Sequence, residues 1–355
     1  MKRILFVGDL RPHTRTSQRL RARRRLGHQV HPISTHVVDS PPPGKERLPL
    51  LHRLCYRLGR PRDANGANAA LLEAVLDRPF DVLWVEKAPC LHASTLTDLA
   101  SRRPEIARAF FSEDDMTRAS NGSAWFRSSI GLYDVVFTTK SHNAAPDELP
   151  ALGAREVGLV SKTYDPLVHR PVAVTDEERR LLGGPIGFIG TFEEARARAL
   201  LTLARSGLDV RVWGNGWSDW AERHARLHIE DRPIYGDAYV RSLCATDVNL
   251  GFLRKASRDE HTDRSVEIPA CGAFLLAERT TEHQRLFREG TEAEFFGDFL
   301  ELSAKVHRYL ADPGARREVA RAGRLRCESD DYSHDASLTA MLARLDAARR
   351  RRLAS

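Results

Sequence analysis

The segment richest in side chains that can do chemistry spans residues 258–272 and reads RDEHTDRSVEIPACG. Charged, hydroxyl and imidazole side chains crowd the positions before Ile268, and an apolar run begins at Gly272. Carboxylates accept hydrogen bonds from sugar hydroxyls, and a guanidinium such as that of Arg264 can meet a phosphate through two parallel hydrogen bonds. A solvated loop is the alternative interpretation, but packing alone does not require such density directly before a buried strand. We therefore expect a site for a ligand that carries sugar and phosphate.

Two glycine turns could add to this site. Residues 190–196 read GTFEEAR, and a glycine turn that leads into a helix offers free N–H groups and the positive end of the helix dipole to a phosphate. Arg196, one turn into that helix, would add a cation. Gly214 lies in a second turn, WGNGW. Neither turn has the full GxGxxG pattern, so each also fits an ordinary end of a strand.

Three consecutive acids, Glu113, Asp114 and Asp115, follow an apolar run in the first half. Such a cluster can assist proton transfer, can hold a divalent metal with a diphosphate, or can cap the following helix. Binding of a divalent metal by these acids would be typical of an enzyme built from a single domain. The richer polar segment in the second half favours a scheme without metal, in which Asp114 and Asp115 act on the acceptor.

The elements that position these residues repeat along the chain. Residues 4–8 (ILFVG) and 186–190 (IGFIG) are short apolar runs closed by glycine and followed by a helical pattern. Further apolar runs follow at βα spacing, at residues 81–86, 107–112, 134–138, 156–160, 209–213, 247–252 and 272–276. Strands that alternate with helices form parallel sheets covered on both faces. The sequence predicts an α/β protein of two Rossmann-like, doubly wound domains facing a central cleft, with ligands beyond the carboxyl ends of the strands.

The expected domains are residues 1–163, residues 176–330, and a C-terminal helix within residues 331–355 that returns to the first domain. The stretch between the two main domains contains prolines and little periodicity. Residues 39–49 carry PPPG and predict a surface loop. We expect the helix near Glu267 to begin at about that residue and the next strand to begin at Gly272.

The composition narrows the class of protein. The chain has 355 residues with 55 Lys and Arg against 48 Asp and Glu, a mild surplus of +7. Five scattered cysteines without a Cys-x-x-Cys pair argue against a disulfide framework or a zinc site, and no apolar run approaches a membrane span, which predicts a cytoplasmic protein. Arginines crowd residues 19–25 and 349–352. They predict either solvated helix surfaces or peripheral contact with an anionic membrane, and a nucleic-acid binder is the least favoured alternative.

Several blocks, taken in order, resemble the CgeB-like glycosyltransferases, a group 1-type branch of the GT-B superfamily associated with polysaccharide biosynthesis. The matching blocks are residues 112–116, 133–140, 164–169, 190–196, 213–217, 261–272, 274–280 and 287–294. Each block is weak by itself, but the ordered set covers most of the chain. The resemblance implies the two-domain architecture already expected from periodicity.

The resemblance also implies roles for individual residues. Glu267 stands where relatives hold the nucleotide ribose, and Asp259 stands where they have a glutamate toward the donor sugar. Thr191 replaces an arginine of the relatives, whereas Arg196 retains a cation for the diphosphate. The expected catalytic residues are Asp114, Asp115, Arg196, Asp259 and Arg264, and the expected nucleotide-sugar contacts are Gly190, Thr191, Gly214, Trp217, His261, Thr262, Ser265 and Glu267.

The function expected from this resemblance is a hexosyltransferase-type reaction. A sugar would move from a nucleotide-sugar donor to a glycan, a lipid-linked molecule or a protein, with retention and without a metal or other cofactor. The alternative is a catalytically degenerate GT-B protein that binds a glycan or assembles a coat.

Overall fold

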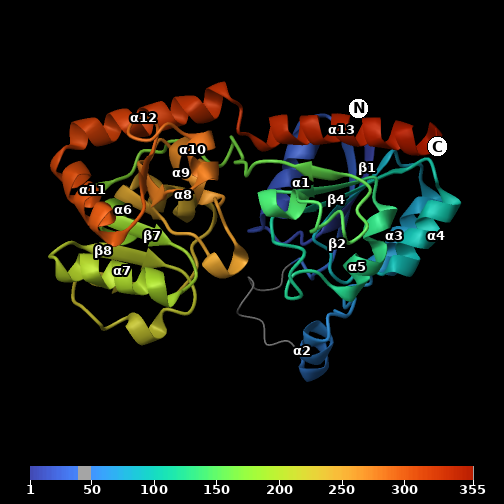
Figure 1. Ribbon diagram of the computed structural model, residues 1–355, viewed down its shortest axis with the longest axis horizontal. Helices are drawn as coiled ribbons and strands as arrows, with labels where there is room; N and C mark the ends of the chain where they lie inside the picture. The colour runs from blue at the N-terminus through green and yellow to red at the C-terminus, as the bar shows by residue number, and fades with distance from the viewer. Residues whose placement is uncertain (39–48, 355) are drawn as a thin grey trace. The chain divides into compact units, whose positions relative to one another are not determined.

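The computed structural model describes residues 1–38 and 49–354, which form two compact units (Figure 1). Unit 1 comprises Met1–Ser161 with His334–Ser355, and unit 2 comprises Lys162–Ser333. Each unit contains a six-stranded parallel sheet with helices on both faces. Most of the predicted loop at residues 39–49 lies outside the described residues.

The sheet of unit 1 has the strand order β2-β1-β3-β4-β5-β6. Its strands are β1 (Arg3–Gly8), β2 (Gln29–Ser34), β3 (Val82–Glu86), β4 (Ala107–Ser112), β5 (Val135–Thr138) and β6 (Val157–Leu159). Its helices are α1 (Arg15–Arg25), α2 (Leu50–Arg57), α3 (Ala67–Asp77), α4 (Ala93–Arg102), α5 (Ala124–Ser129) and α13 (His334–Ala354). The central strands are apolar throughout because α1 and α13 bury one face of the sheet, while α3, α4 and α5 bury the other.

The sheet of unit 2 has the strand order β12-β11-β10-β7-β8-β9, the dinucleotide-fold order 3-2-1-4-5-6 when counted from β7. Its strands are β7 (Gly184–Ile189), β8 (Val210–Trp213), β9 (Leu227–Ile229), β10 (Thr246–Gly251), β11 (Leu275–Glu278) and β12 (Glu294–Phe296). Its helices are α6 (Asp176–Leu182), α7 (Glu194–Arg205), α8 (Gly236–Cys244), α9 (Arg264–Ala270), α10 (Thr281–Leu286), α11 (Phe299–Ala311) and α12 (Pro313–Ser329).

Every apolar run named from the sequence contains a strand, but β2, β9 and β12 were not predicted. All three are edge strands. β9 and β12 have three residues each, and β2 contains Pro32, so none carries the long apolar signal of a central strand. Two expected boundaries are also shifted: α9 begins at Arg264, before Glu267, and β11 begins at Leu275, after Gly272.

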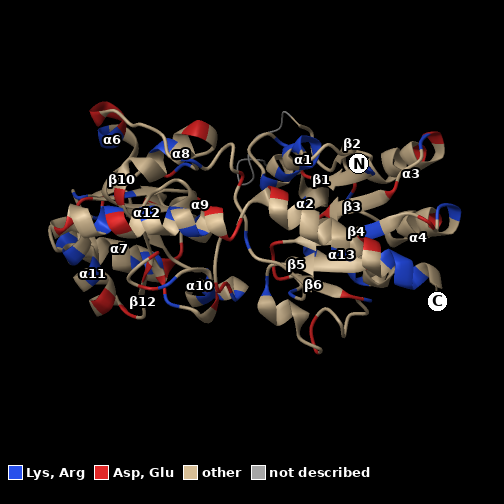
Figure 2. Ribbon diagram, turned by 90° about the horizontal axis from the view of Figure 1, so that it is seen from above, with Lys and Arg blue, Asp and Glu red and all other residues tan. Residues whose placement is uncertain are grey.

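The two arginine clusters divide between buried, paired side chains and exposed ones such as Arg21, Arg24 and Arg350, so the expectation of a solvated helix surface holds for part of each cluster, and contact with a membrane stays a prediction. In α1, the buried Arg19 and Arg23 both pair with the buried Glu86, at 2.8 and 3.2 Å. At the end of α13, where Lys and Arg positions gather (Figure 2), Arg351 pairs with Glu156 and Arg352 with Asp134. Among the described residues, no helix combines the length and apolarity needed to cross a bilayer.

Candidate functional site

The loops that follow β7 and β10 lie at the centre of the sheet of unit 2, because these two strands are direct neighbours. In an open α/β sheet this is the switch point of the strand order, and ligands bind there beyond the carboxyl ends of the strands. Most of the residues predicted for the second half fall in these loops or on α9, which follows the second of them.

Arg196 on α7 joins the two loops. Its Nη1 donates to the carbonyl of Thr191 at 2.9 Å, and its Nη2 donates to the carbonyl of Leu253 and to the carboxylate of Glu193, each at 3.1 Å. Burial lowers the pKa of Arg196, and the charge of Glu193 opposes that shift. Since the guanidinium already has three protein acceptors, it positions the loops, and its expected direct contact with phosphate stays a prediction.

Two partly or fully exposed arginines lie near Arg196. Arg254 follows β10 and pairs with Glu193 at 3.3 Å, and Arg264 is the first residue of α9. Burial is the main cause of the lowered pKa of Arg196. Repulsion from Arg254 and Arg264 lowers this pKa further, so the three guanidinium groups lie within electrostatic range. The Nε of Arg264 is buried without a hydrogen-bond partner among the described residues. This arrangement favours an anionic ligand.

The two glycine turns touch each other. Gly214 has a φ of 153°, and a Cβ there would lie 1.9 Å from the carbonyl oxygen of Gly190, so a side chain does not fit. The indole Nε1 of Trp217 donates to the same carbonyl at 2.9 Å, and its ring is fully buried. Trp217 therefore supports the turn from the core, and its burial leaves no ring face for the expected nucleotide contact. Thr191 is exposed at the turn.

Glu267 is 1% exposed, which corrects the expectation of an open carboxylate. Its Oε2 accepts a hydrogen bond from the Tyr239 hydroxyl at 2.5 Å, and its Oε1 lies 3.5 Å from Nε2 of His169. The carboxylate thus joins α9 to α8 and to the segment before α6. Contact with a ribose stays a prediction. Tyr239 was not identified from the sequence because only the packing of α8 on α9 brings it to Glu267.

A hydrogen-bonded chain fixes the first turn of α9. Ser265 Oγ lies 2.7 Å from Nε2 of His283 and accepts from the N–H of Thr262 at 3.0 Å, while Nδ1 of His283 lies 2.7 Å from the carbonyl of Glu278. Burial lowers the pKa of His283 to about 4. The imidazole is therefore neutral near pH 7, donating from Nδ1 to Glu278 and accepting the Ser265 hydroxyl at Nε2. No motif signals His283 in the sequence.

The remaining predicted residues of the segment differ in exposure. His261 is buried, and its Nε2 accepts from the N–H of Lys162 at 3.3 Å. The Lys162 ammonium lies 3.4 Å from the Asp263 carboxylate, so this pair of contacts ties the start of unit 2 to the loop before α9. Asp259 is partly exposed in the same loop. Of these side chains, Asp259 is the more available to a ligand.

The two acids predicted to act together in unit 1 occupy different environments. Asp115 is fully buried and accepts hydrogen bonds from Asn143 and Thr117, each at 2.9 Å, which joins the loops after β4 and β5. Asp114 is about half exposed and pairs with Lys87, the residue after β3. Asp114 is therefore accessible, and its expected role in proton transfer stays a prediction, whereas the burial of Asp115 corrects its expected contact with an acceptor.

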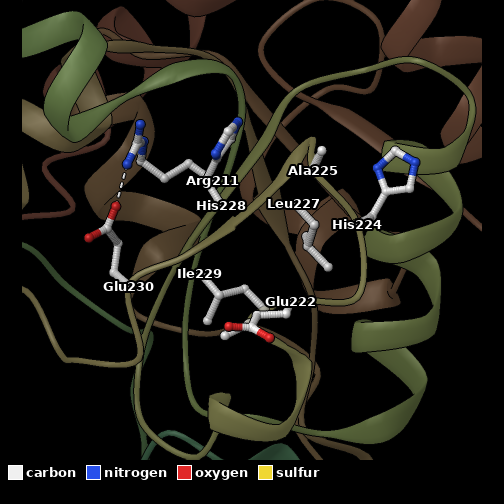
Figure 3. Close-up of a pocket in the computed structure, with 9 residues that line it drawn as sticks. Arg211, Glu222, His224, Ala225, Leu227, His228, Ile229 and Glu230 are labelled. Atoms are coloured by element: carbon white, nitrogen blue, oxygen red, sulfur yellow. Dashed lines mark hydrogen bonds and ion pairs between the residues drawn. The ribbon is translucent and has the colours of Figure 1, made fainter.

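A separate cavity of about 570 Å³ lies at the β9 edge of the sheet of unit 2 (Figure 3). Arg211 on β8 and Glu230 beside β9 form an ion pair at its rim. None of the predicted site residues lines it, so it is separate from the switch point. Within residues 1–38 and 49–354, no group of three His, Cys, Asp or Glu side chains is arranged to hold a metal.

Comparisons with known proteins agree with this architecture. Residues 195–343 match a family model described as glycosyl transferase-like. This segment begins on α7, includes Arg196, Arg254, Arg264 and Glu267, and extends into α13. No curated protein matches the sequence.

Solved structures match the whole chain at low identity. Sucrose-phosphate synthase from Thermosynechococcus elongatus has a TM-score of 0.69 at 13% identity, covering 98% of this chain and 100% of that one. Anabaena HepE in complex with UDP-glucose has a TM-score of 0.62 at 11% identity with the same coverage, and a glycosyltransferase from Rickettsia africae has 0.65 at 10%, covering 98% of each chain. These likenesses confirm the predicted GT-B fold class of two Rossmann-like domains.

Proposed function

We propose that this protein is a glycosyltransferase that uses a nucleotide-sugar donor and belongs to the CgeB-like branch. The observation that carries the proposal is the gathering of Arg196, Arg254 and Arg264 at the switch point of unit 2, inside the segment that matches the glycosyl transferase-like model. Three cations at the carboxyl ends of parallel strands suit a diphosphate. HepE, which has the same fold, has been solved with UDP-glucose, and the same class of donor is proposed here.

In this proposal the cations carry the electrostatic part of the reaction. Departure of a nucleoside diphosphate leaves negative charge on the phosphate oxygens while positive charge develops on the sugar. Arg264, whose Nε lacks a partner among the described atoms, and the exposed Arg254 would meet that negative charge. Arg196 would keep the loops bearing Thr191 and Leu253 at a fixed separation.

The finer parts of the proposal concern the other residues. Asp259 would contact the donor sugar, and the amides after Gly190 would add hydrogen bonds to the diphosphate. On the acceptor side, Asp114 would assist removal of the proton from the attacking hydroxyl. We propose retention of configuration, a hexosyl donor, no metal, and a glycan, lipid-linked or protein acceptor in the cytoplasm.

A panel of nucleotide sugars tests the proposal directly. Donor hydrolysis or transfer, followed by NMR, should release a nucleoside diphosphate from one member of the panel. Arg254→Gln with Arg264→Gln should lower the rate at least ~10-fold, since each charge-assisted hydrogen bond contributes about 1.5–3 kcal/mol. Arg198→Gln is the matched control, because Arg198 lies on the same helix as Arg196 but is exposed and pairs with Glu194.

Two results would contradict parts of this scheme. Tight nucleotide binding by calorimetry without turnover of any donor would favour the degenerate GT-B alternative. Loss of turnover in EDTA with recovery in manganese would remove the metal-free part and return attention to the acids at 113–115.

A further inference from the structure

Helix α2 is the least covered helix of unit 1. None of its residues is buried, and Figure 1 shows it projecting from the unit beyond α5. The chain after it is anchored: the carbonyl of Gly59 accepts from the N–H of Ala124 at 2.6 Å, and the carbonyl of Pro61 accepts from the indole of Trp125 at 3.3 Å. The helix is thus held at its C-terminal side and exposed along its length.

The side chains of α2 separate into two faces. Leu50, Leu51 and Leu54 of α2 and Leu58, the residue that caps its C-terminus, are 81, 54, 54 and 67% exposed. At about 100° per residue these four leucines fall within roughly 100° of the helix circumference. The rest of the circumference carries His52, Arg53, Cys55, Tyr56 and Arg57. Four leucines exposed on one face of a short helix form a contiguous apolar stripe, which a helix of an isolated globular unit normally buries.

The charged residues beside this apolar stripe, within residues 49–62, are all positive. Residues 49–62 contain Arg53, Arg57, Arg60 and Arg62 and no Asp or Glu. Arg53 and Arg57 are exposed and form no ion pair within the described part of the chain, and Arg60 lies 5.9 Å from the ring centre of Trp125. Unlike Arg19 and Arg23 of α1 and Arg351 and Arg352 of α13, Arg53 and Arg57 have no acidic partner within the part of unit 1 that the structure describes.

We infer that α2 lies in the interface of an anionic phospholipid bilayer, with its leucines among the acyl chains and its arginines at the lipid phosphates. An apolar stripe bordered by cations is the pattern of a helix that lies in the plane of a membrane surface. Long arginine side chains reach headgroups from beside an apolar face, and Tyr56 adds an amphipathic ring suited to that depth. A protein partner would require acidic complementarity at the same spacing, whereas an anionic bilayer supplies it everywhere.

Vesicle sedimentation with the full-length chain tests the inference. Binding should be strong to phosphatidylcholine mixed with phosphatidylglycerol, weak to phosphatidylcholine alone, and reduced by salt. Leu51→Ser with Leu54→Ser should weaken partitioning roughly 30-fold or more. Arg53→Gln with Arg57→Gln should weaken it roughly 10–30-fold on the anionic vesicles only. Because α2 has no buried residue, circular dichroism should show both variants fully folded.

Leu300→Ser with Leu325→Ser is the matched control, since these leucines are 79 and 50% exposed on α11 and α12. It should bind vesicles as the unaltered chain does. Equal binding to neutral and anionic vesicles, or no binding to either, would overturn the inference. So would a change from dimer to monomer on replacing Leu51 and Leu54, because the stripe would then be covered by a second copy. The assay needs no donor or turnover, so its outcome is separate from that of the proposed function.

Discussion

The two units each bury a glutamate, but they compensate its charge differently. In unit 1, Glu86 at the end of β3 faces two guanidinium groups, those of Arg19 and Arg23, and also accepts from the indole of Trp84 at 3.3 Å. In unit 2, Glu267 faces a tyrosine hydroxyl and an imidazole. The first arrangement is a buried ion cluster, and the second is a hydrogen-bonded acid.

This difference shows that the partners of a buried charged side chain determine how strongly the fold depends on it. Arg23 is fully buried between the rings of Phe6 and Trp84, at 4.7 and 4.2 Å, and burial lowers its pKa to about 10. It remains charged at neutral pH and depends on Glu86. Glu267 joins neighbouring elements through the Tyr239 hydroxyl and the His169 imidazole. We therefore expect replacement of Glu86 to affect folding more than replacement of Glu267.

The largest effect should come from Glu86→Gln. Removing this charge leaves the fully buried Arg23 without its carboxylate and Arg19 with Glu113 at 3.1 Å, and an uncompensated buried charge typically costs about 3–5 kcal/mol. Hydrogen exchange in increasing urea should show the peptides of unit 1 losing protection by that amount.

Arg23→Met provides the contrast within the same cluster. The Nε and Nη2 of Arg23 have no hydrogen-bond partner among the described residues, and Arg19 still pairs with Glu86 when Arg23 is gone. The free energy of unfolding should change by less than about 1 kcal/mol. If Arg23→Met were as damaging as Glu86→Gln, the cluster could not be described as an acid that compensates two cations.

Glu267→Gln should have the next largest effect. It replaces one acceptor oxygen by an amide donor opposite Tyr239 or His169, and a lost charge-assisted hydrogen bond costs about 1.5–3 kcal/mol. Exchange protection in α8 and α9 should fall accordingly. Unchanged protection together with weaker nucleotide binding would instead show that Glu267 acts on the ribose and not on the fold.

His283 should make unit 2 sensitive to acid. Burial lowers its pKa from an ordinary 6.5 to about 4, so between these values the unfolded chain binds more protons and stability falls as pH falls. At about pH 5 the loss relative to neutral pH should be ~2 kcal/mol. Gln at this position retains an acceptor but does not titrate, so this part of the acid sensitivity should be absent in His283→Gln. An equally steep pH dependence in the variant would assign it to other groups.

The smallest effect on stability should come from Arg196→Lys. A lysine retains the charge but cannot donate to Thr191, Leu253 and Glu193 with the geometry of a guanidinium. Nucleotide affinity by calorimetry should fall about 10-fold with little change in melting temperature. Equal loss in affinity with Arg198→Lys, whose guanidinium pairs with Glu194 on the exposed side of α7, would show that the link between the loops is not responsible.

The central strands of both sheets were predictable because runs such as ILFVG and IGFIG are buried on both faces and leave a continuous apolar signal. The edge strands β2, β9 and β12 were not, since β9 and β12 have three residues each and β2 is partly exposed and contains Pro32, so none of them leaves a continuous apolar signal. The density of polar groups in the segment 258–272 predicted a ligand region there. Its residues could not be divided into exposed and buried ones, because that division depends on α8 and α10.

By itself, then, the sequence determined the α/β class and the two successive Rossmann-like openings, because periodicity and glycine turns are local properties of the chain. Only the tertiary structure decided which charged side chains are enclosed in the protein and which are exposed to a ligand or a surface. Arg19 and Arg23 are enclosed with Glu86, Asp115 is enclosed with Asn143, and Arg53 and Arg57 are left exposed on α2. The physical reason is that a charge is neutralised by groups distant in sequence, and only the folded chain brings those groups within reach.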